Sequence, residues 1–192
     1  MKINNLIVKT SPFKYFYGDL DMNDELLNKL IIWLKETDNW NYVETDFYEQ
    51  YEFFFSNTNL PKHLNYFISD TFITKLKKYM SNIFEKKFKN NVDIIAHKLI
   101  DNQTIRIHND YLENEESDSH RLLIQLNSNW QEENGGFLMF FDEQEELTDI
   151  ILPTVGSVQG FEISKISNHA VSTIHNAERY TLIFYFYEDI SC

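Results

Sequence analysis

The sequence has a single cysteine, Cys192, which is its last residue, so no intrachain disulfide can form. No signal-peptide pattern opens the chain, and together these two features predict a cytoplasmic protein. No apolar run approaches the roughly 20 residues that are needed to span a bilayer. With 5 glycines and 3 prolines among 192 residues, there is little room for a flexible linker. We therefore expect one domain over residues 1–192, with no membrane contact.

Positive charge is also scarce. Lys and Arg number 17 against 30 Asp and Glu, which gives a formal net charge of −13. A nucleic-acid-binding protein needs clustered basic residues, so this balance makes a nucleic-acid partner unlikely. The lysines that do cluster, between residues 75 and 87, are interpreted as the solvated face of a helix. The sequence does not indicate an oligomeric state.

Apolar and aromatic residues are abundant: the hydrophobic fraction is 43%, with 16 Phe and 11 Tyr. This composition is typical of a globular protein. Apolar residues recur at helical spacing after Asn23, and again after Ser69 and Asp70, and each of these polar residues is a suitable N-cap. Residues 1–90 are therefore predicted to form a mainly helical supporting layer.

From residue 91 the pattern changes to short aromatic or β-branched segments that are separated by polar turns. Eight such segments are expected to be strands: 92–100, 104–110, 121–127, 137–141, 150–152, 155–161, 170–174 and 180–187. Eight strands are the number expected of a jelly roll. The predicted fold class is α+β with a mainly β core, in which N-terminal helices pack on a double-stranded β-helix (91–192). The acidic stretch 113–118 interrupts the strands and is expected to be a mobile loop beside the site.

Three residues have the chemistry of a metal site: His108, Asp110 and, further along the chain, His169. Residues two apart on a strand share a face, so His108 and Asp110 are expected to chelate one ion from a single strand end. Two imidazoles and one carboxylate can hold Fe(II) and leave other coordination positions open. A surface His beside a surface Asp is common, and His175 competes with His169 as the third ligand.

Arg179 begins the last apolar strand, on the same face as Thr181, Ile183 and Tyr185. A charge that points inward from such a strand needs a partner. The planar guanidinium can grip the carboxylate of an acidic co-substrate through two hydrogen bonds. An Arg at a strand edge that reaches solvent or a neighbouring carboxylate would give the same pattern.

The chain resembles a known family in five motifs. They are His108-Asn109-Asp110, residues 121–130 (RLLIQLNSNW), Gly135-Gly136-Phe137-Leu138, His169-Ala170-Val171 and Arg179-Tyr180-Thr181-Leu182. In these residues it is similar to the 2-oxoglutarate- and Fe(II)-dependent dioxygenases, most closely their prolyl-4-hydroxylase-like branch. The resemblance implies an iron site made by the two histidines and Asp110, and a 2-oxoglutarate site at Arg179. It also implies an enzyme that uses O2, releases succinate and CO2, and has ascorbate as a candidate reductant.

The chain departs from that branch in two places. A Tyr often lies ten residues before the first His, and another precedes the Leu-Asn pair; here these positions are Lys98 and Gln125. We expect Lys98, Gln125 and Thr181 to supply the co-substrate hydrogen bonds instead.

For the substrate, the resemblance favours hydroxylation of an amino-acid or peptidyl residue. Related halogenases lack the carboxylate ligand that Asp110 provides, and nucleic-acid demethylases typically carry a second Arg where this chain has Tyr185. The carboxylates of the acidic stretch 113–118 favour a substrate with positive character. Another small metabolite as substrate, and a non-catalytic jelly-roll binding module, are the alternatives.

Overall fold

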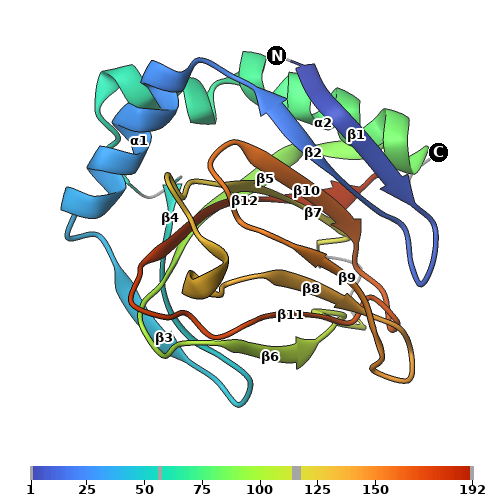
Figure 1. The fold of residues 1–192 in the computed structure, drawn as a ribbon. Helices are drawn as coiled ribbons and strands as arrows, with labels where there is room; N and C mark the ends of the chain where they lie inside the picture. Colours follow the sequence, from blue (N-terminus) through green and yellow to red (C-terminus); the bar gives the residue numbers. More distant parts are fainter. Residues whose placement is uncertain (1, 56–57, 114–117, 191–192) are drawn as a thin grey trace.

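The computed structural model describes residues 2–55, 58–113 and 118–190, and it consists of two facing β-sheets with helices on one side (Figure 1). The helices cover the outer face of the larger sheet, and the smaller sheet lies on the opposite side of it. The inner faces of the two sheets enclose the space in which the sequence places its candidate site. Most of the acidic stretch 113–118 lies outside the described residues, so its predicted mobility is not addressed by the structure.

The larger sheet is antiparallel throughout. Its strands, in spatial order, are β1 (Lys2–Lys9), β2 (Tyr15–Asp21), β10 (Ser157–Glu162), β7 (His120–Gln125), β12 (Arg179–Glu188), β5 (Phe88–Leu99), β4 (Glu49–Phe54) and β3 (Asn41–Glu44). The smaller sheet has the order β6 (Ile105–His108), β11 (His169–Val171), β8 (Leu138–Phe141) and β9 (Leu147–Ile151).

Two helices carry the apolar stripes that were expected. Helix α1 (Asp24–Glu36) is capped by Asn23, whose Oδ1 accepts a hydrogen bond of 2.9 Å from the Leu26 amide. Helix α2 (Asp70–Phe84) is capped by the Ser69 hydroxyl, which accepts from the Phe72 amide. Their apolar faces pack on the sheet, as in the edge-to-face contact of Phe72 with Phe184 of β12. The 3-10 helices η2 (Lys62–Ile68) and η3 (Glu132–Asn134) complete the helical segments of the described chain.

The eight strands expected from residue 91 onward each correspond to one strand from β5 to β12, which confirms the predicted fold class. The expectation for residues 1–90 was incomplete, because that region also holds β1 to β4, which extend the larger sheet at both edges. These edge strands have weak local signals. In β1, Ile3 is the one buried residue, so no alternation of apolar and polar side chains marks it.

Two apolar cores flank the larger sheet. One lies under the helices, and the other lies between the sheets and includes Tyr15, Phe140, Phe161 and Ile183. Among the described residues, no helix is long and apolar enough to cross a membrane.

Candidate active site

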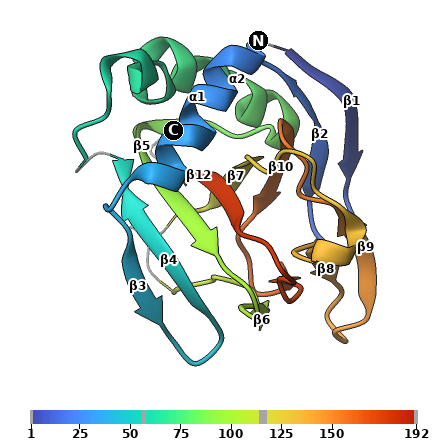
Figure 2. The same ribbon diagram turned by 60° about the vertical axis from the view of Figure 1, so that its left-hand side comes forward.

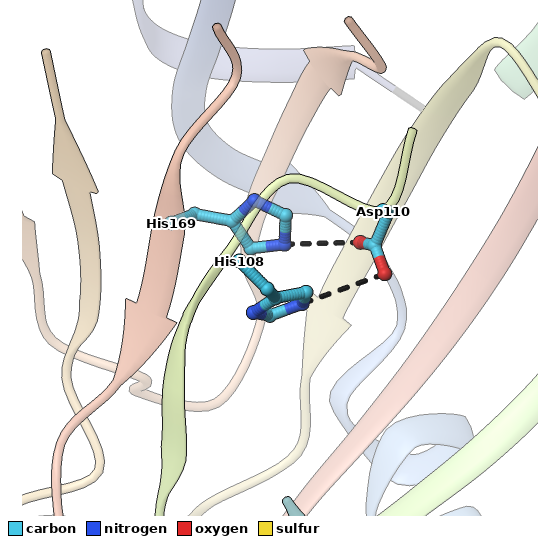
Figure 3. Close-up of side chains that lie close together, drawn as sticks. All are labelled: His108, Asp110 and His169. Atoms are coloured by element: carbon cyan, nitrogen blue, oxygen red, sulfur yellow. Dashed lines mark ion pairs between the residues drawn. The ribbon is translucent and has the colours of Figure 1, made fainter. Parts of the chain in front are cut away.

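His108, Asp110 and His169 come together between the sheets, and one ligand atom from each lies within 4.8 Å of the others (Figure 3). His108 ends β6 and His169 begins β11, and the two residues are directly paired across these strands. Asp110 Oδ1 lies 3.4 Å from His108 Nε2, and Asp110 Oδ2 lies 3.1 Å from His169 Nε2. Residues from two distant segments of the chain therefore converge at one point.

Asp110 reaches this position by a different route from the one expected. Strand β6 ends at His108, so Asp110 does not share a strand face with it. Instead, Asp110 has a positive φ of 57° and turns its carboxylate back towards both histidines. An aspartate tolerates this left-handed conformation better than most residues.

The two imidazole rings are oriented by the backbone. His108 Nδ1 lies 2.9 Å from the Arg106 carbonyl, and His169 Nδ1 lies 2.8 Å from the Ser167 carbonyl. Each Nδ1–H can therefore donate to a carbonyl. Each imidazole ring is then neutral, and the lone pair on its Nε2 points at the Asp110 carboxylate. Burial lowers the pKa of His169 and so favours this neutral form. Three electron-pair donors that face one another suit a divalent cation.

Arg121, whose role the sequence analysis missed, holds the other side of Asp110. It forms ion pairs with Asp110 and with Asp118, the latter at 2.8 Å, and its guanidinium lies over the Tyr185 ring. Burial raises the pKa of Asp110, but the positive charge of Arg121 holds it well below its usual range. The sequence feature that could have indicated a role for Arg121 is its position directly before the apolar run of β7.

Arg179 lies buried in the same cavity, with 2% of its surface exposed. Its Nη1 donates to Thr181 Oγ1 at 2.8 Å, whereas Nε and Nη2 are buried without a hydrogen-bond partner among the described residues. Burial lowers the pKa of Arg179 to about 9, which reflects the cost of an unpaired charge. Gly136 packs against the side chain, because a Cβ there would lie 3.0 Å from Arg179 Cδ.

A chain of hydrogen bonds positions Thr181 beside this guanidinium. The Thr181 hydroxyl donates to Gln125 Oε1 at 3.0 Å, and Gln125 Nε2 donates to Gln159 Oε1 at 2.8 Å. Thr181 lines the cavity directly. Gln125 is fully buried and is not among the lining residues, so it acts on the cavity through Thr181.

Two other predicted positions lie away from the cavity. Lys98 projects from the opposite face of β5, where its Nζ lies 4.6 Å from the centre of the Tyr51 ring, and this placement removes it from the candidate contacts. Its neighbour His97 lines the cavity instead. His175 is exposed in the turn after β11 and does not belong to the cluster of ligand atoms that contains His169.

The cavity that contains these groups has a volume of about 160 Å³. The triad lies on one wall and Arg179 with Thr181 on another, while Leu138, Phe161 and Ile183 supply apolar surface between them. A larger hollow of about 440 Å³ lies beside α1 and His63. We place the active site in the smaller cavity because it holds both the triad and the unpaired buried guanidinium.

Known proteins resemble this chain in sequence and in fold. Residues 95–187, which contain the triad and Arg179, match the family described as the 2OG-Fe(II) oxygenase superfamily. No curated protein sequence matches the chain.

Several solved structures share the fold. A prolyl-4-hydroxylase from Pseudomonas putida superposes with a TM-score of 0.77 and 14% identity, over 91% of this chain and 92% of that one. A Trichoplax adhaerens prolyl hydroxylase in complex with a hypoxia inducible factor peptide gives 0.73 and 12%, over 91% and 83%. The viral collagen prolyl hydroxylase of Paramecium Bursaria Chlorella virus-1, in a 2OG complex, gives 0.64 and 15%, over 90% and 94%.

The chain has a prolyl-hydroxylase-like fold, and residues 95–187, just under half of its length, match the 2OG-Fe(II) oxygenase superfamily. Together these findings support a 2-oxoglutarate-dependent dioxygenase, and the matched family implies Fe(II) and 2-oxoglutarate as cofactor and co-substrate.

Proposed function

We propose that this enzyme hydroxylates an amino-acid or peptidyl residue and releases succinate and CO2. The observation that supports this most directly is Arg179, which is buried in the same cavity as the His108, Asp110 and His169 cluster. Its Nε and Nη2 have no hydrogen-bond partner in the described part of the chain. A ligand that reaches both groups needs metal-chelating oxygens at one end and a carboxylate at the other. 2-Oxoglutarate has this arrangement.

In this proposal each residue has one task. His108, Asp110 and His169 hold Fe(II), and Arg179 with Thr181 binds the distal carboxylate of 2-oxoglutarate. When bound, Fe(II) and 2-oxoglutarate would supply the O2-dependent oxidation, in which one oxygen atom of O2 enters the substrate and the other enters succinate. The apolar walls at Leu138 and Phe161 restrict water.

The residues around the triad keep its geometry fixed. The backbone carbonyls of Arg106 and Ser167 fix the two rings, and Arg121 keeps Asp110 ionised. Groups of this kind orient metal ligands and raise metal affinity. Asp110 occupies the ligand position that halogenases leave open, which supports hydroxylation as the outcome.

The substrate class rests on similarity as well as on the site. Structures that share this fold are named as prolyl hydroxylases, and one of them holds a peptide, which supports a peptidyl or amino-acid substrate here. We retain ascorbate as a candidate reductant and the cytoplasm as the proposed location.

The test is succinate release from the Fe(II)-loaded protein over a panel of blocked peptides, free amino acids and other small metabolites. The proposal predicts that at least one compound stimulates succinate release and gains one oxygen atom by mass spectrometry. An Asp110→Ala variant serves as the inactive control. Stimulation by free small metabolites alone would redirect the assignment away from amino acids and peptides.

A further inference from the structure

The proposed function leaves a second polar group in the cavity without a task. Gln50 and Glu52 lie on β4 and His97 lies on β5, and all three line the cavity that the triad and Arg179 share. Figure 2 shows β4 beside β5, with β3 as the outer strand at that edge of the sheet. Gln50 is 2% exposed and His97 is 9% exposed, so both are buried polar residues.

These side chains are close together, but some of their polar atoms lack a hydrogen-bond partner among the described residues. Gln50 Nε2 donates to Glu52 Oε2 at 3.1 Å, and His97 Nε2 lies 3.5 Å from the same oxygen without a hydrogen bond. Gln50 Oε1 and His97 Nε2 have no hydrogen-bond partner among the described residues. A native protein rarely leaves such buried atoms unpaired, so water or a ligand is the expected partner.

The charge of Glu52 is also unmatched. Burial, reinforced by the charges of Arg121 and Arg179, lowers the pKa of His97 to about 3, so the neutral ring offers Glu52 no positive charge. In the described chain no Lys or Arg pairs with Glu52, and Arg121 is engaged by Asp110 and Asp118. A carboxylate that faces a cavity beside a second free acceptor, Gln50 Oε1, is complementary to a cation with several N–H groups.

Glu52 lies within reach of the reacting centre. Burial raises the pKa of both the Tyr48 and Tyr185 phenols, and the carboxylates of Glu52 and Asp110 both contribute to each shift. The two phenols and the two carboxylates line the same cavity. A substrate whose charged end is at Glu52 can extend past these rings to the triad.

The wall that carries Glu52 is fixed relative to the triad. The Arg106 amide donates to the Phe47 carbonyl at 2.8 Å, and the Phe47 ring stacks on His108 with 4.7 Å between ring centres. On the other side, the strand register places His97 between Glu52 and Thr181. The neutral His97 ring thus separates the Glu52 carboxylate from the residues that are proposed to bind 2-oxoglutarate.

We propose that Glu52, together with Gln50 Oε1, binds a positively charged group of the substrate, an ammonium or a guanidinium. The enzyme would then select amine- or guanidine-bearing amino-acid or peptidyl substrates over neutral analogues of the same shape. This assignment rests on the proposed function, because it places the rest of the substrate at the triad.

The test uses n-butylammonium as the probe and 1-butanol as its neutral analogue. The protein is loaded with Mn(II) and 2-oxoglutarate, and the relaxation of the ligand methyl protons is measured by NMR, with Asp110→Ala as the background for Mn(II) bound elsewhere. Glu52→Gln removes the charge at constant size. Glu49→Gln is the matched control, because Glu49 lies on the same strand and its carboxylate accepts from the exposed Tyr42 hydroxyl instead.

We expect Mn(II) to enhance the relaxation of n-butylammonium far more than that of 1-butanol in the wild type and in Glu49→Gln. In Glu52→Gln the dissociation constant of n-butylammonium should rise by about tenfold or more. Equal enhancement for both ligands in the wild type, a comparison that needs no variant, overturns the proposal, as does unchanged binding in Glu52→Gln. Water-proton relaxation reports Mn(II) binding separately. If Mn(II) fails to bind, the proposed function fails and the Glu52 assignment falls with it.

Discussion

At the residue scale, Asp110 has the largest number of tasks in the site. It faces both histidines and pairs with Arg121. We predict that Asp110→Ala weakens Mn(II) binding by more than about 100-fold, because removing a direct ligand should exceed the 10–100-fold effect of outer partners. Isothermal titration calorimetry measures this. Asp21→Ala, at an exposed position, is the control, and wild-type affinity in Asp110→Ala would remove this residue from the metal site.

A substitution at Arg179 should weaken co-substrate binding without weakening metal binding. Arg179→Lys keeps the charge but loses the planar guanidinium, whose Nε and Nη2 have no partner among the residues that the structure describes. We predict that 2-oxoglutarate binds about tenfold more weakly to this variant while the Mn(II) affinity is unchanged, as measured by calorimetry with each ligand in turn. Arg106→Lys, where the arginine lies on the surface, should leave both affinities unchanged. Equal loss of both affinities in Arg179→Lys would show that Arg179 is structural.

The burial of Arg179 also predicts an effect on stability. An unpaired buried charge destabilises the folded state, and burial is the cause of its lowered pKa. Arg179→Met should therefore raise the free energy of unfolding of the ligand-free protein by about 1 kcal/mol or more, while it abolishes 2-oxoglutarate binding. Urea denaturation measures the first effect. If Arg179→Met is less stable than the wild type, the guanidinium stabilises the folded state even without a ligand, which would contradict this prediction.

At the scale of elements, His120 joins β7 to α2 and β5. Its ring lies 4.5 Å from the Phe84 ring and 4.9 Å from the Phe88 ring, and burial lowers its pKa to about 3. An unfolded histidine takes up a proton below about pH 6.5, whereas the folded one stays neutral. The unfolded state therefore binds more protons, and stability is lost as the pH falls from about 6.5 towards 3.

His120→Leu should reduce this loss of stability by up to about 5 kcal/mol across that pH range. Part of the pH dependence of stability should remain in this variant. His97 has a similarly lowered pKa, and the carboxylates of the protein also titrate at acidic pH. Denaturant unfolding at a series of pH values provides the measurement, with the exposed His63→Leu as the control. If the free energy of unfolding depends on pH in the same way in the wild type and in His120→Leu, burial does not lower the pKa of His120 as proposed.

The elements also show what local sequence can predict. The strands β5 to β12 were predictable because each is a short apolar segment between polar turns, and the caps at Asn23 and Ser69 mark the two helices. The edge strands β1 and β3 bury few side chains and were missed. Lys98 was expected to contact 2-oxoglutarate, but it lies outside the cavity and its neighbour His97 lines it, because a shift of one residue moves a side chain to the other face of a strand.

At the scale of the whole molecule, the site is assembled from segments that are far apart in sequence. The jelly roll pairs His108 with His169 directly, and each motif was recognisable because its residues are local. The positions of Glu52 and Gln50 depend on the pairing of β4 with β5, which no local pattern encodes. The same holds for the turn at Asp110, since its positive φ is not visible in a His-x-Asp pattern.

The central claim is that one cavity holds Fe(II) at His108, Asp110 and His169 and 2-oxoglutarate at Arg179. The most direct measurement is anaerobic addition of 2-oxoglutarate to the Fe(II)-loaded protein, followed by visible absorption. We predict a weak charge-transfer band of the chelated complex in the wild type. It should require more 2-oxoglutarate in Arg179→Lys and be missing in Asp110→Ala. A wild-type protein that binds Fe(II) but shows no such band at saturating 2-oxoglutarate would contradict the account.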